Sequence, residues 1–236
     1  MNKTAAYMPA DLNRLERETG MLLATVESLS EDEMRAPSLC EGWTRAHVVA
    51  HMIGLAGGLG NLVTWAVTGT ETPMYSCPED RDAQIEDLAK MSAAELKQEL
   101  REATAGFQAL AGQLRNTKLA TEEVSLPSGP FNAYAIPALW TTEVLVHHND
   151  LDTLWKLDEG DMDALEDALE LAMAKLSKRD DWPGLTVITD EGENYTIGDG
   201  ATTLKGGRDA IIGWVTRGLT DGLRYEGELP ERPKYA

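Results

Sequence analysis

The sequence has 236 residues and only four histidines, and these histidines fall in two short segments. His47 and His51 lie four residues apart in the first segment, while His147 and His148 follow Glu143 in the second. Side chains four residues apart share one face of an α-helix. Imidazoles and a carboxylate arranged in this way are ligands for a divalent metal. The spacing therefore indicates a metal site that is built from two helices.

The apolar residues around each segment indicate which ligands face the core. One stripe per segment has helical spacing: Val48, Leu55, Leu59 and Leu62 in the first, and Ile136, Trp140, Leu151 and Leu154 in the second. The first stripe contains His51 and the second contains Glu143 and His147, so His148 is expected to point elsewhere. A carboxylate on an apolar face is costly unless it is paired or bound to a metal. His51, Glu143 and His147 together suit zinc with an open fourth position.

Other interpretations of these polar residues are open. A buried hydrogen-bonded network of the glutamate and the histidines is the alternative to a metal site, because such networks also occur in protein cores. Asp150, one turn beyond His147, is a candidate acceptor for a ligand N–H, and a helix-surface charge is its alternative. No sequence feature gives Cys40 or Cys77 an activating base, so neither is expected to be a nucleophile. Without a secretory signal, a structural disulfide is not expected either.

The composition excludes several classes of partner. A net charge of −19 argues against binding to nucleic acid or to anionic membrane surfaces. The negative charge also repels an anionic substrate at distances shorter than the screening length, which is about 8 Å at physiological salt. Such a substrate therefore needs a positively charged residue in its binding site. The sequence has no run of eighteen apolar residues, and its amino-terminal segment lacks the apolar run of a signal peptide. A cytoplasmic location is expected.

Apolar periodicity predicts four main helices in the first two-thirds of the chain. Three are expected over residues 10–29, 44–67 and 92–114, with Thr44 and Ser92 as N-caps, and the fourth starts near Tyr134 and carries Glu143 and His147. A shorter helix is expected over residues 79–89. The second main helix carries four glycines, which indicate close helix approach or room for a ligand beside His51: Gly54, Gly57, Gly58 and Gly60. Four principal helices predict a bundle.

The pattern changes near Asp158. An acidic helix up to residue 176 precedes three short strand-like segments and a final helix, and its charges are interpreted as solvation rather than calcium binding. The strands, expected to form a small antiparallel sheet, are residues 185–189, 195–197 and 202–204, and the final helix is residues 208–218. The predicted fold class is therefore α+β, with a four-helix bundle over residues 1–157 and a small α/β domain over residues 158–236.

Several segments of the chain form recognisable motifs. They are Glu41-Gly-Trp-Thr-Arg-Ala-His47 through His51, Trp65, Thr68-Gly-Thr-Glu-Thr-Pro-Met-Tyr75, Glu143-x-x-x-His147-x-x-Asp150-Leu151, Thr216-Arg217-Gly218 and Gly227-Glu-Leu-Pro230. Together these motifs resemble those of the mycothiol-dependent maleylpyruvate isomerases. This resemblance implies a DinB-like four-helix bundle with a divalent metal, typically zinc, and a small C-terminal domain. It places the metal ligands on His51, Glu143 and His147. It places a functionally important arginine on Arg217, for which a surface arginine at a helix C-terminus is the alternative.

The resemblance also implies an activity. The family uses the small thiol mycothiol to isomerise maleylpyruvate to fumarylpyruvate in gentisate breakdown. The expected function is thus a thiol-dependent cis–trans isomerase, acting as a monomer or weak homo-oligomer on a small anionic substrate. Two alternatives remain open at this stage. One is a thiol S-transferase of the same superfamily, and the other is a non-enzymatic metal-binding stress protein.

Overall fold

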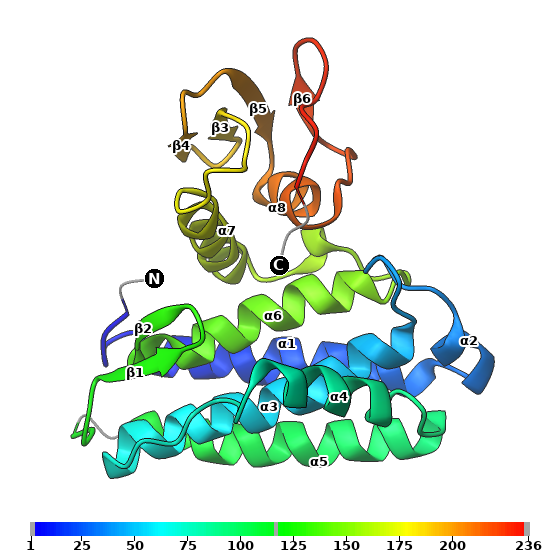
Figure 1. Ribbon diagram of the computed structural model, residues 1–236, viewed down its shortest axis with the longest axis vertical. Coiled ribbons are helices and arrows are strands. Elements are labelled where there is room, and N and C mark those ends of the chain that lie inside the picture. Colours follow the sequence, from blue (N-terminus) through cyan, green and yellow to red (C-terminus); the bar gives the residue numbers. More distant parts are fainter. Residues whose placement is uncertain (1–2, 116–117, 234–236) are drawn as a thin grey trace. The chain divides into compact units, whose positions relative to one another are not determined.

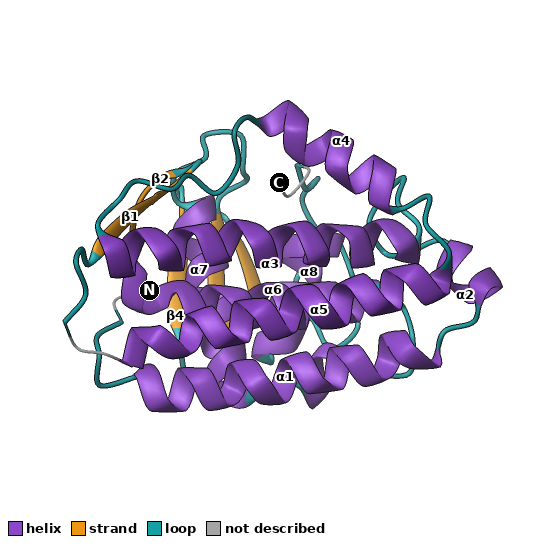
Figure 2. Ribbon diagram, turned by 90° about the horizontal axis from the view of Figure 1, so that it is seen from below, coloured by secondary structure: helices purple, strands orange, loops and turns teal. Residues whose placement is uncertain are grey.

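Four long helices make up most of the first part of the chain. The computed structural model describes residues 3–115 and 118–233. The chain divides into two units, and the boundary lies between Trp155 and Lys156. In the first unit α1 (Met8–Ser28) and α3 (Arg45–Thr68) each pack against both α5 (Ala93–Ala111) and α6 (Ile136–Asp150). These contacts close a ring of four helices, whose ribbons lie side by side in Figures 1 and 2. The predicted four-helix bundle and the α+β class are confirmed.

Helix α3 carries His51 and is almost entirely buried. Its first turn is fixed by Thr44, whose backbone N–H donates to Nδ1 of His47, and it ends at Gly69 in the left-handed conformation. By length and composition alone α3 could cross a membrane, but 83 % of its most apolar stretch is buried inside the structure. A core helix of a soluble protein has the same composition, so this is weak evidence for a membrane span.

The glycines of α3 allow neighbouring segments to approach closely. A Cβ on Gly58 would lie 2.8 Å from Cγ of Met74 and 3.2 Å from the Met74 carbonyl oxygen. Gly54 faces the side chain of Gln84 in α4 (Pro78–Leu88), which packs on α3. Gly54, Gly58 and Gly60 are therefore points of close approach, which is one of the two interpretations of the sequence, whereas a Cβ on Gly57 would meet nothing within 4 Å.

Some local features differ from the sequence expectations. Leu154 is 97 % exposed, so its assignment to the buried stripe of the last bundle helix was wrong. The reason is that α6 ends at Asp150 and the chain turns at Asp152, which has a φ of +49°, so the helical period stops. The elements of the first unit that were not predicted include the short helix α2 (Glu31–Arg35) and a hairpin of β1 (Glu123–Leu126) and β2 (Gly129–Asn132).

The second unit is a small α/β structure. It begins with the 3-10 turn η3 (Leu157–Glu159), and its two helices, α7 (Met162–Leu176) and α8 (Arg208–Arg217), pack against each other. The sheet has the order β4-β3-β5-β6, with β3 (Leu185–Thr189), β4 (Asn194–Ile197), β5 (Thr202–Gly206) and β6 (Arg224–Tyr225). The β3–β4 pair is antiparallel as expected, and β6, a strand that the sequence did not predict, pairs antiparallel with β5. β5, however, joins the other edge of β3, and because it runs opposite to β4 it pairs with β3 in parallel.

The close approach at Gly58 gives a stability prediction. Gly58→Ala should lower the free energy of unfolding by about 1–3 kcal/mol, because the added methyl overlaps Met74 and the Tyr75 ring. Gly57→Ala is the matched control on the same helix: its Cβ meets nothing within 4 Å and the residue is exposed. That control should gain up to about 1 kcal/mol from better helix propensity. Urea denaturation of both variants measures the difference, and equal stabilities would contradict the packing argument.

Candidate metal centre

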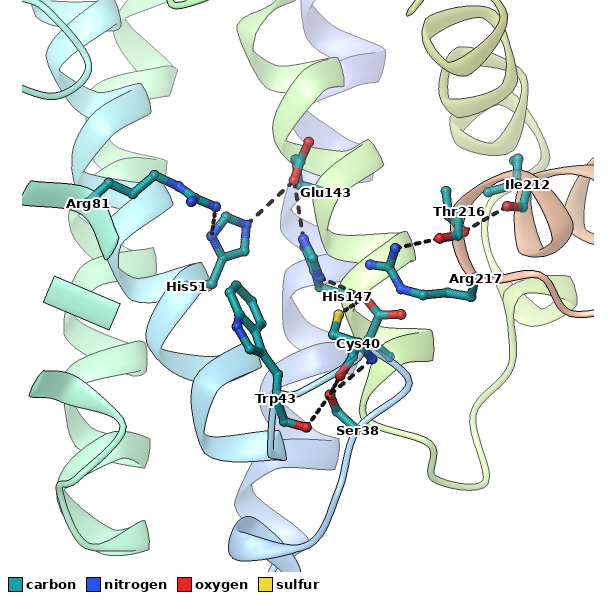
Figure 3. A network of polar contacts seen from close by, with 11 residues as sticks. Ser38, Cys40, Trp43, His51, Arg81, Glu143, His147, Ile212, Thr216 and Arg217 are labelled. Carbon is teal, nitrogen blue, oxygen red and sulfur yellow. Dashed lines mark hydrogen bonds and ion pairs between the residues drawn. The ribbon is translucent and has the colours of Figure 1, made fainter. Parts of the chain in front are cut away.

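The structure brings His51, Glu143 and His147 together. His51 comes from α3, while Glu143 and His147 lie one turn apart on α6, and Figure 3 shows the two rings pointing at the same carboxylate. Oε2 of Glu143 lies 3.4 Å from Nε2 of His147 and 3.7 Å from Nε2 of His51. The three ligand-type atoms are all within 4.8 Å of one another. His51 and His147 are only 6 % and 9 % exposed.

These separations fit an ion better than a hydrogen-bonded network. An N–H to carboxylate hydrogen bond is about 2.7–3.2 Å long, so both distances from Glu143 are too great for strong bonds. Ligands about 2.0–2.2 Å from a tetrahedral zinc lie roughly 3.3–3.5 Å from each other. The cluster has the donor set and nearly the spacing that such an ion requires. His51, Glu143 and His147 could therefore hold a divalent metal and leave a coordination position open.

A buried carboxylate orients the second histidine. Asp150 is fully buried, and its Oδ2 accepts a hydrogen bond from Nδ1 of His147 at 2.8 Å. The same oxygen lies 3.2 Å from the donating Sγ of Cys40, which belongs to the loop before α3. Cys40, His147 and Asp150 thus also form a group of ligand-type atoms, but these atoms already bond to one another. The arrangement leaves Nε2 of His147 directed toward Glu143.

The other member of the first histidine pair has a different role. Nδ1 of His47 pairs with the Thr44 hydroxyl at 2.7 Å, which is part of the cap of α3. Its Nε2 faces Glu86, at 3.7 Å. The ring of Trp43 lies beside both histidines, with its centroid 6.2 Å from His47 and 5.9 Å from His51. His47 is therefore a capping residue, and Trp43 shields one side of His51.

The two clustered histidines have opposite protonation tendencies in the metal-free protein. Burial, followed by the neighbouring His147, lowers the pKa of His51 to about 4, so its ring is neutral at pH 7. Burial also acts to lower the pKa of His147, but its hydrogen bond with Asp150, together with the nearby Cys40 and Glu143 side chains, outweighs burial and raises that pKa well above its usual value. A metal requires a free Nε2 lone pair, so binding at His147 releases a proton. Metal affinity is expected to fall as the pH is lowered.

Two residues near His51 were not identified as functional from the sequence. Nη2 of Arg81, on α4, lies 3.4 Å from Nδ1 of His51. Tyr75 lies close to Arg81 and Glu143, and its burial is the main reason that its pKa is raised, with Arg81 acting in the opposite direction. Tyr75 falls within the Thr68–Tyr75 motif of the family resemblance, but no sequence signal marks Arg81, because it lies on a short, strongly charged helix.

His148 lies away from the cluster, as expected, but it is buried. Its Nε2 pairs with the Thr25 hydroxyl of α1 at 2.7 Å, and its ring stacks on Trp155 with centroids 3.9 Å apart. Burial lowers its pKa to about 4, so it is a neutral core residue at pH 7. Its contacts join α1 to the end of α6.

Arg217 belongs to the second unit. It is the last residue of α8, before Gly218 in the left-handed conformation, and its Nη1 donates to the Thr216 carbonyl at 2.9 Å. Arg232 donates to the same carbonyl and to that of Val215. Burial, followed by the charge of Arg217, lowers the pKa of Arg232. Two guanidinium groups thus meet at the C-terminal end of α8, where the carbonyl groups attract positive charge.

The first unit is a four-helix bundle that clusters two histidines and a glutamate, a set that could hold a metal ion, and comparisons identify its family. Residues 15–152, more than half of the chain, match the family described as the mycothiol maleylpyruvate isomerase N-terminal domain. The chain belongs to this family. Two crystal structures, of the mycothiol-dependent maleylpyruvate isomerase and of a histidine-to-alanine mutant of it, match with a TM-score of 0.87. Each is 24 % identical over 99 % of this chain and 100 % of the matched chain, a likeness that shows the fold. No curated protein matches the chain.

The metal-ligand assignment can be tested by substitution. His51→Ala should abolish tight binding of zinc, because it removes one of three ligands from the cluster. Elemental analysis after dialysis of zinc-loaded protein measures the bound metal per chain. His47→Ala is the matched control and should keep its metal, because His47 bonds to Thr44 instead. Full retention in the first variant, or loss in the control alone, would show that the wrong histidine was assigned.

Asp150→Asn is a graded version of the same test. It keeps the size of the side chain but weakens the bond that orients His147. Loss of such a supporting hydrogen bond lowers metal affinity by about 10–100-fold. Competition with a chelator is the measurement, and it should place this variant between the wild type and His51→Ala.

Proposed function

We propose that this protein is a metal- and thiol-dependent cis–trans isomerase that converts maleylpyruvate to fumarylpyruvate in gentisate breakdown. The observation that carries the proposal is the buried cluster of His51, Glu143 and His147 in a chain of the mycothiol maleylpyruvate isomerase family. Mycothiol is the proposed thiol, by analogy with the family description. The three residues are the proposed ligands of one divalent ion, with zinc favoured by two nitrogens and one oxygen.

Each residue of the centre has a definable task. A divalent ion bound there would supply the positive charge that keeps a coordinated thiol deprotonated near neutral pH. Glu143 contributes the negative charge that balances the ion, and His51 contributes a neutral ring. Asp150 holds the Nδ1 proton of His147 and so fixes the direction of its Nε2 lone pair. Trp43 covers one side of His51 and keeps water from that side.

The proposed reaction proceeds through a thiol adduct. A bound thiolate would supply a nucleophile for one carbon of the conjugated double bond, with the electron pair moving toward the conjugated carbonyl group. The former double bond would then be a single bond, free to rotate. Return of the electron pair would expel the thiolate and give the trans isomer. The thiol is regenerated, so the cycle needs no oxidant or reductant.

A requirement for added thiol is the central prediction. Zinc-loaded protein should deplete maleylpyruvate, followed by its ultraviolet absorbance, only when mycothiol is present, and the thiol concentration should stay constant. Consumption of one thiol per substrate would identify an S-transferase instead. Absence of turnover with any thiol, in protein that retains its metal, would favour the non-enzymatic metal-binding alternative.

The thiol requirement has an internal control in the two cysteines. The double variant Cys40→Ala, Cys77→Ala should still turn over with mycothiol, because Cys40 donates to Asp150 and Cys77 precedes the first turn of α4. The expected loss is confined to the small contribution of the Cys40 hydrogen bond, about 1 kcal/mol or less. Turnover by thiol-free wild-type protein, abolished in the double variant, would place the nucleophile within the chain.

We also propose that Arg217 binds a carboxylate of the substrate. The protein is strongly acidic and the substrate is a dianion, so local positive charge is required. A planar guanidinium can hold a carboxylate through two parallel hydrogen bonds, which lysine cannot reproduce. Arg217→Lys should therefore keep the fold and the metal but lower kcat/KM at least tenfold, about 1.4 kcal/mol. Unchanged kinetics with maleylpyruvate would leave Arg217 with the alternative role of a residue that caps α8.

The proposed chemistry also suggests the cellular location and the partners of the protein. We propose a cytoplasmic protein, because a free thiol cofactor persists where thiols are kept reduced. The partners are a small anionic substrate and a small thiol, and the net charge of −19 disfavours nucleic acid and anionic membranes. We propose a monomer or a weak homo-oligomer.

A further inference from the structure

The side of His51 that faces away from Glu143 meets a cation. Nη2 of Arg81 lies 3.4 Å from Nδ1 of His51, and Figure 3 shows the guanidinium reaching the ring from α4. The other terminal nitrogen, Nη1, pairs with the exposed neighbour Asp82 at 2.8 Å. The Arg81 side chain is 35 % exposed. One edge of the guanidinium is thus directed at a buried ring and the other at solvent.

This contact is incompatible with metal binding by the same ring. In the neutral ring only one nitrogen carries a proton, and a guanidinium can only donate hydrogen bonds. When Nε2 of His51 gives its lone pair to a metal, the proton must be on Nδ1. The Nδ1–H and the Arg81 N–H groups are then donors that face each other at 3.4 Å. An acceptor between them, or a displacement of Arg81, is required.

The second histidine of the cluster shows what kind of acceptor is suitable. Nδ1 of His147 donates to the buried carboxylate of Asp150, which is the usual arrangement for a metal-binding histidine. In the described part of the chain, the partner that faces Nδ1 of His51 is Arg81 and not a carboxylate. A carboxylate from a ligand would complete the arrangement, because its two oxygens can accept from Nδ1–H and from the guanidinium together.

There is room for a small acid next to this arginine. Arg81 contributes to the wall of a hollow of about 580 Å³, which is also lined by Met74, Tyr75, Ser76 and Asp80. The other charged residue of this wall, Asp80, is hydrogen-bonded to Ser76. Arg81 therefore supplies the positive charge of the hollow, in a protein whose overall charge repels anions.

We propose that Arg81 and Nδ1–H of His51 form a carboxylate-binding subsite, which holds one carboxylate of the acidic substrate beside the metal centre. This inference rests on the proposed function, which supplies the acidic substrate, and on metal binding through Nε2 of His51. It makes Arg81 a specificity-determining residue within the helical bundle. It also couples the two sites: an anion at Arg81 favours the His51 tautomer that binds the metal, and the metal favours the anion to the same extent.

The test is binding of maleate, a dicarboxylate probe, to the zinc-loaded full-length protein by isothermal titration calorimetry. Arg81→Gln should weaken maleate binding at least tenfold, whereas Arg81→Lys should lose less because it keeps the charge. Lys90→Gln is the matched control, since it removes one positive charge from an exposed residue just beyond α4 and should bind like the wild type. Elemental analysis should give the same zinc content for all four proteins.

The subsite and the proposed reaction can fail separately. Maleate binding that depends on Arg81, in protein without isomerase turnover, would support the subsite and reject the reaction. If turnover occurs, Arg81→Gln should raise the KM for maleylpyruvate and leave the KM for mycothiol unchanged. Equal maleate affinity in the wild type and Arg81→Gln, or no maleate binding to the zinc-loaded wild type, would overturn the subsite. Circular dichroism and thermal melting verify that the variants fold.

Discussion

The first unit is organised around a carboxylate that two buried imidazoles face. Glu143 lies 3.4 and 3.7 Å from the two Nε2 atoms, distances longer than a strong N–H to carboxylate hydrogen bond. A positive ion between the three groups would offset the cost of keeping them together in a largely apolar bundle. The helices that carry the ligands, α3 and α6, pack directly against each other, and α1 and α5 complete the ring. The geometry of the centre is thus a property of the whole bundle.

Helix periodicity predicted the members of this cluster because burial selects one face of each helix. His51 falls on the buried face of α3, whereas His47, one turn earlier, caps the helix near its half-buried start. The same reasoning failed at Leu154, because periodicity does not reveal where a helix stops. It also could not place β5 beside β3, since strand order depends on contacts between segments that local sequence does not encode. The fold class and the antiparallel β3–β4 pair were predictable from patterns, and the parallel pairing of β5 with β3 was not.

The contacts between residues far apart in the chain were the part of the centre that could not be predicted from the sequence. Cys40 meets Asp150 across 110 positions of the chain, in a loop with no periodic pattern. Arg81 reaches His51 because the small residues on α3 let α4 and the Met74–Tyr75 segment approach closely. The glycines were visible in the sequence as a sign of close approach. Which side chains would use that approach required the three-dimensional structure.

The two histidines of the centre differ in the group that faces Nδ1, the ring nitrogen directed away from Glu143. This difference gives the two residues different roles. His147 has a permanent carboxylate partner in Asp150, so its orientation does not depend on any ligand. His51 faces the donor groups of Arg81, so its Nδ1 has no built-in acceptor among the described residues. A metal held by both rings is therefore supported by the protein on one side and open to support by a bound acid on the other. In the proposed centre a substrate carboxylate would take part in completing the metal site, and reaction would then be favoured only when that carboxylate is in place.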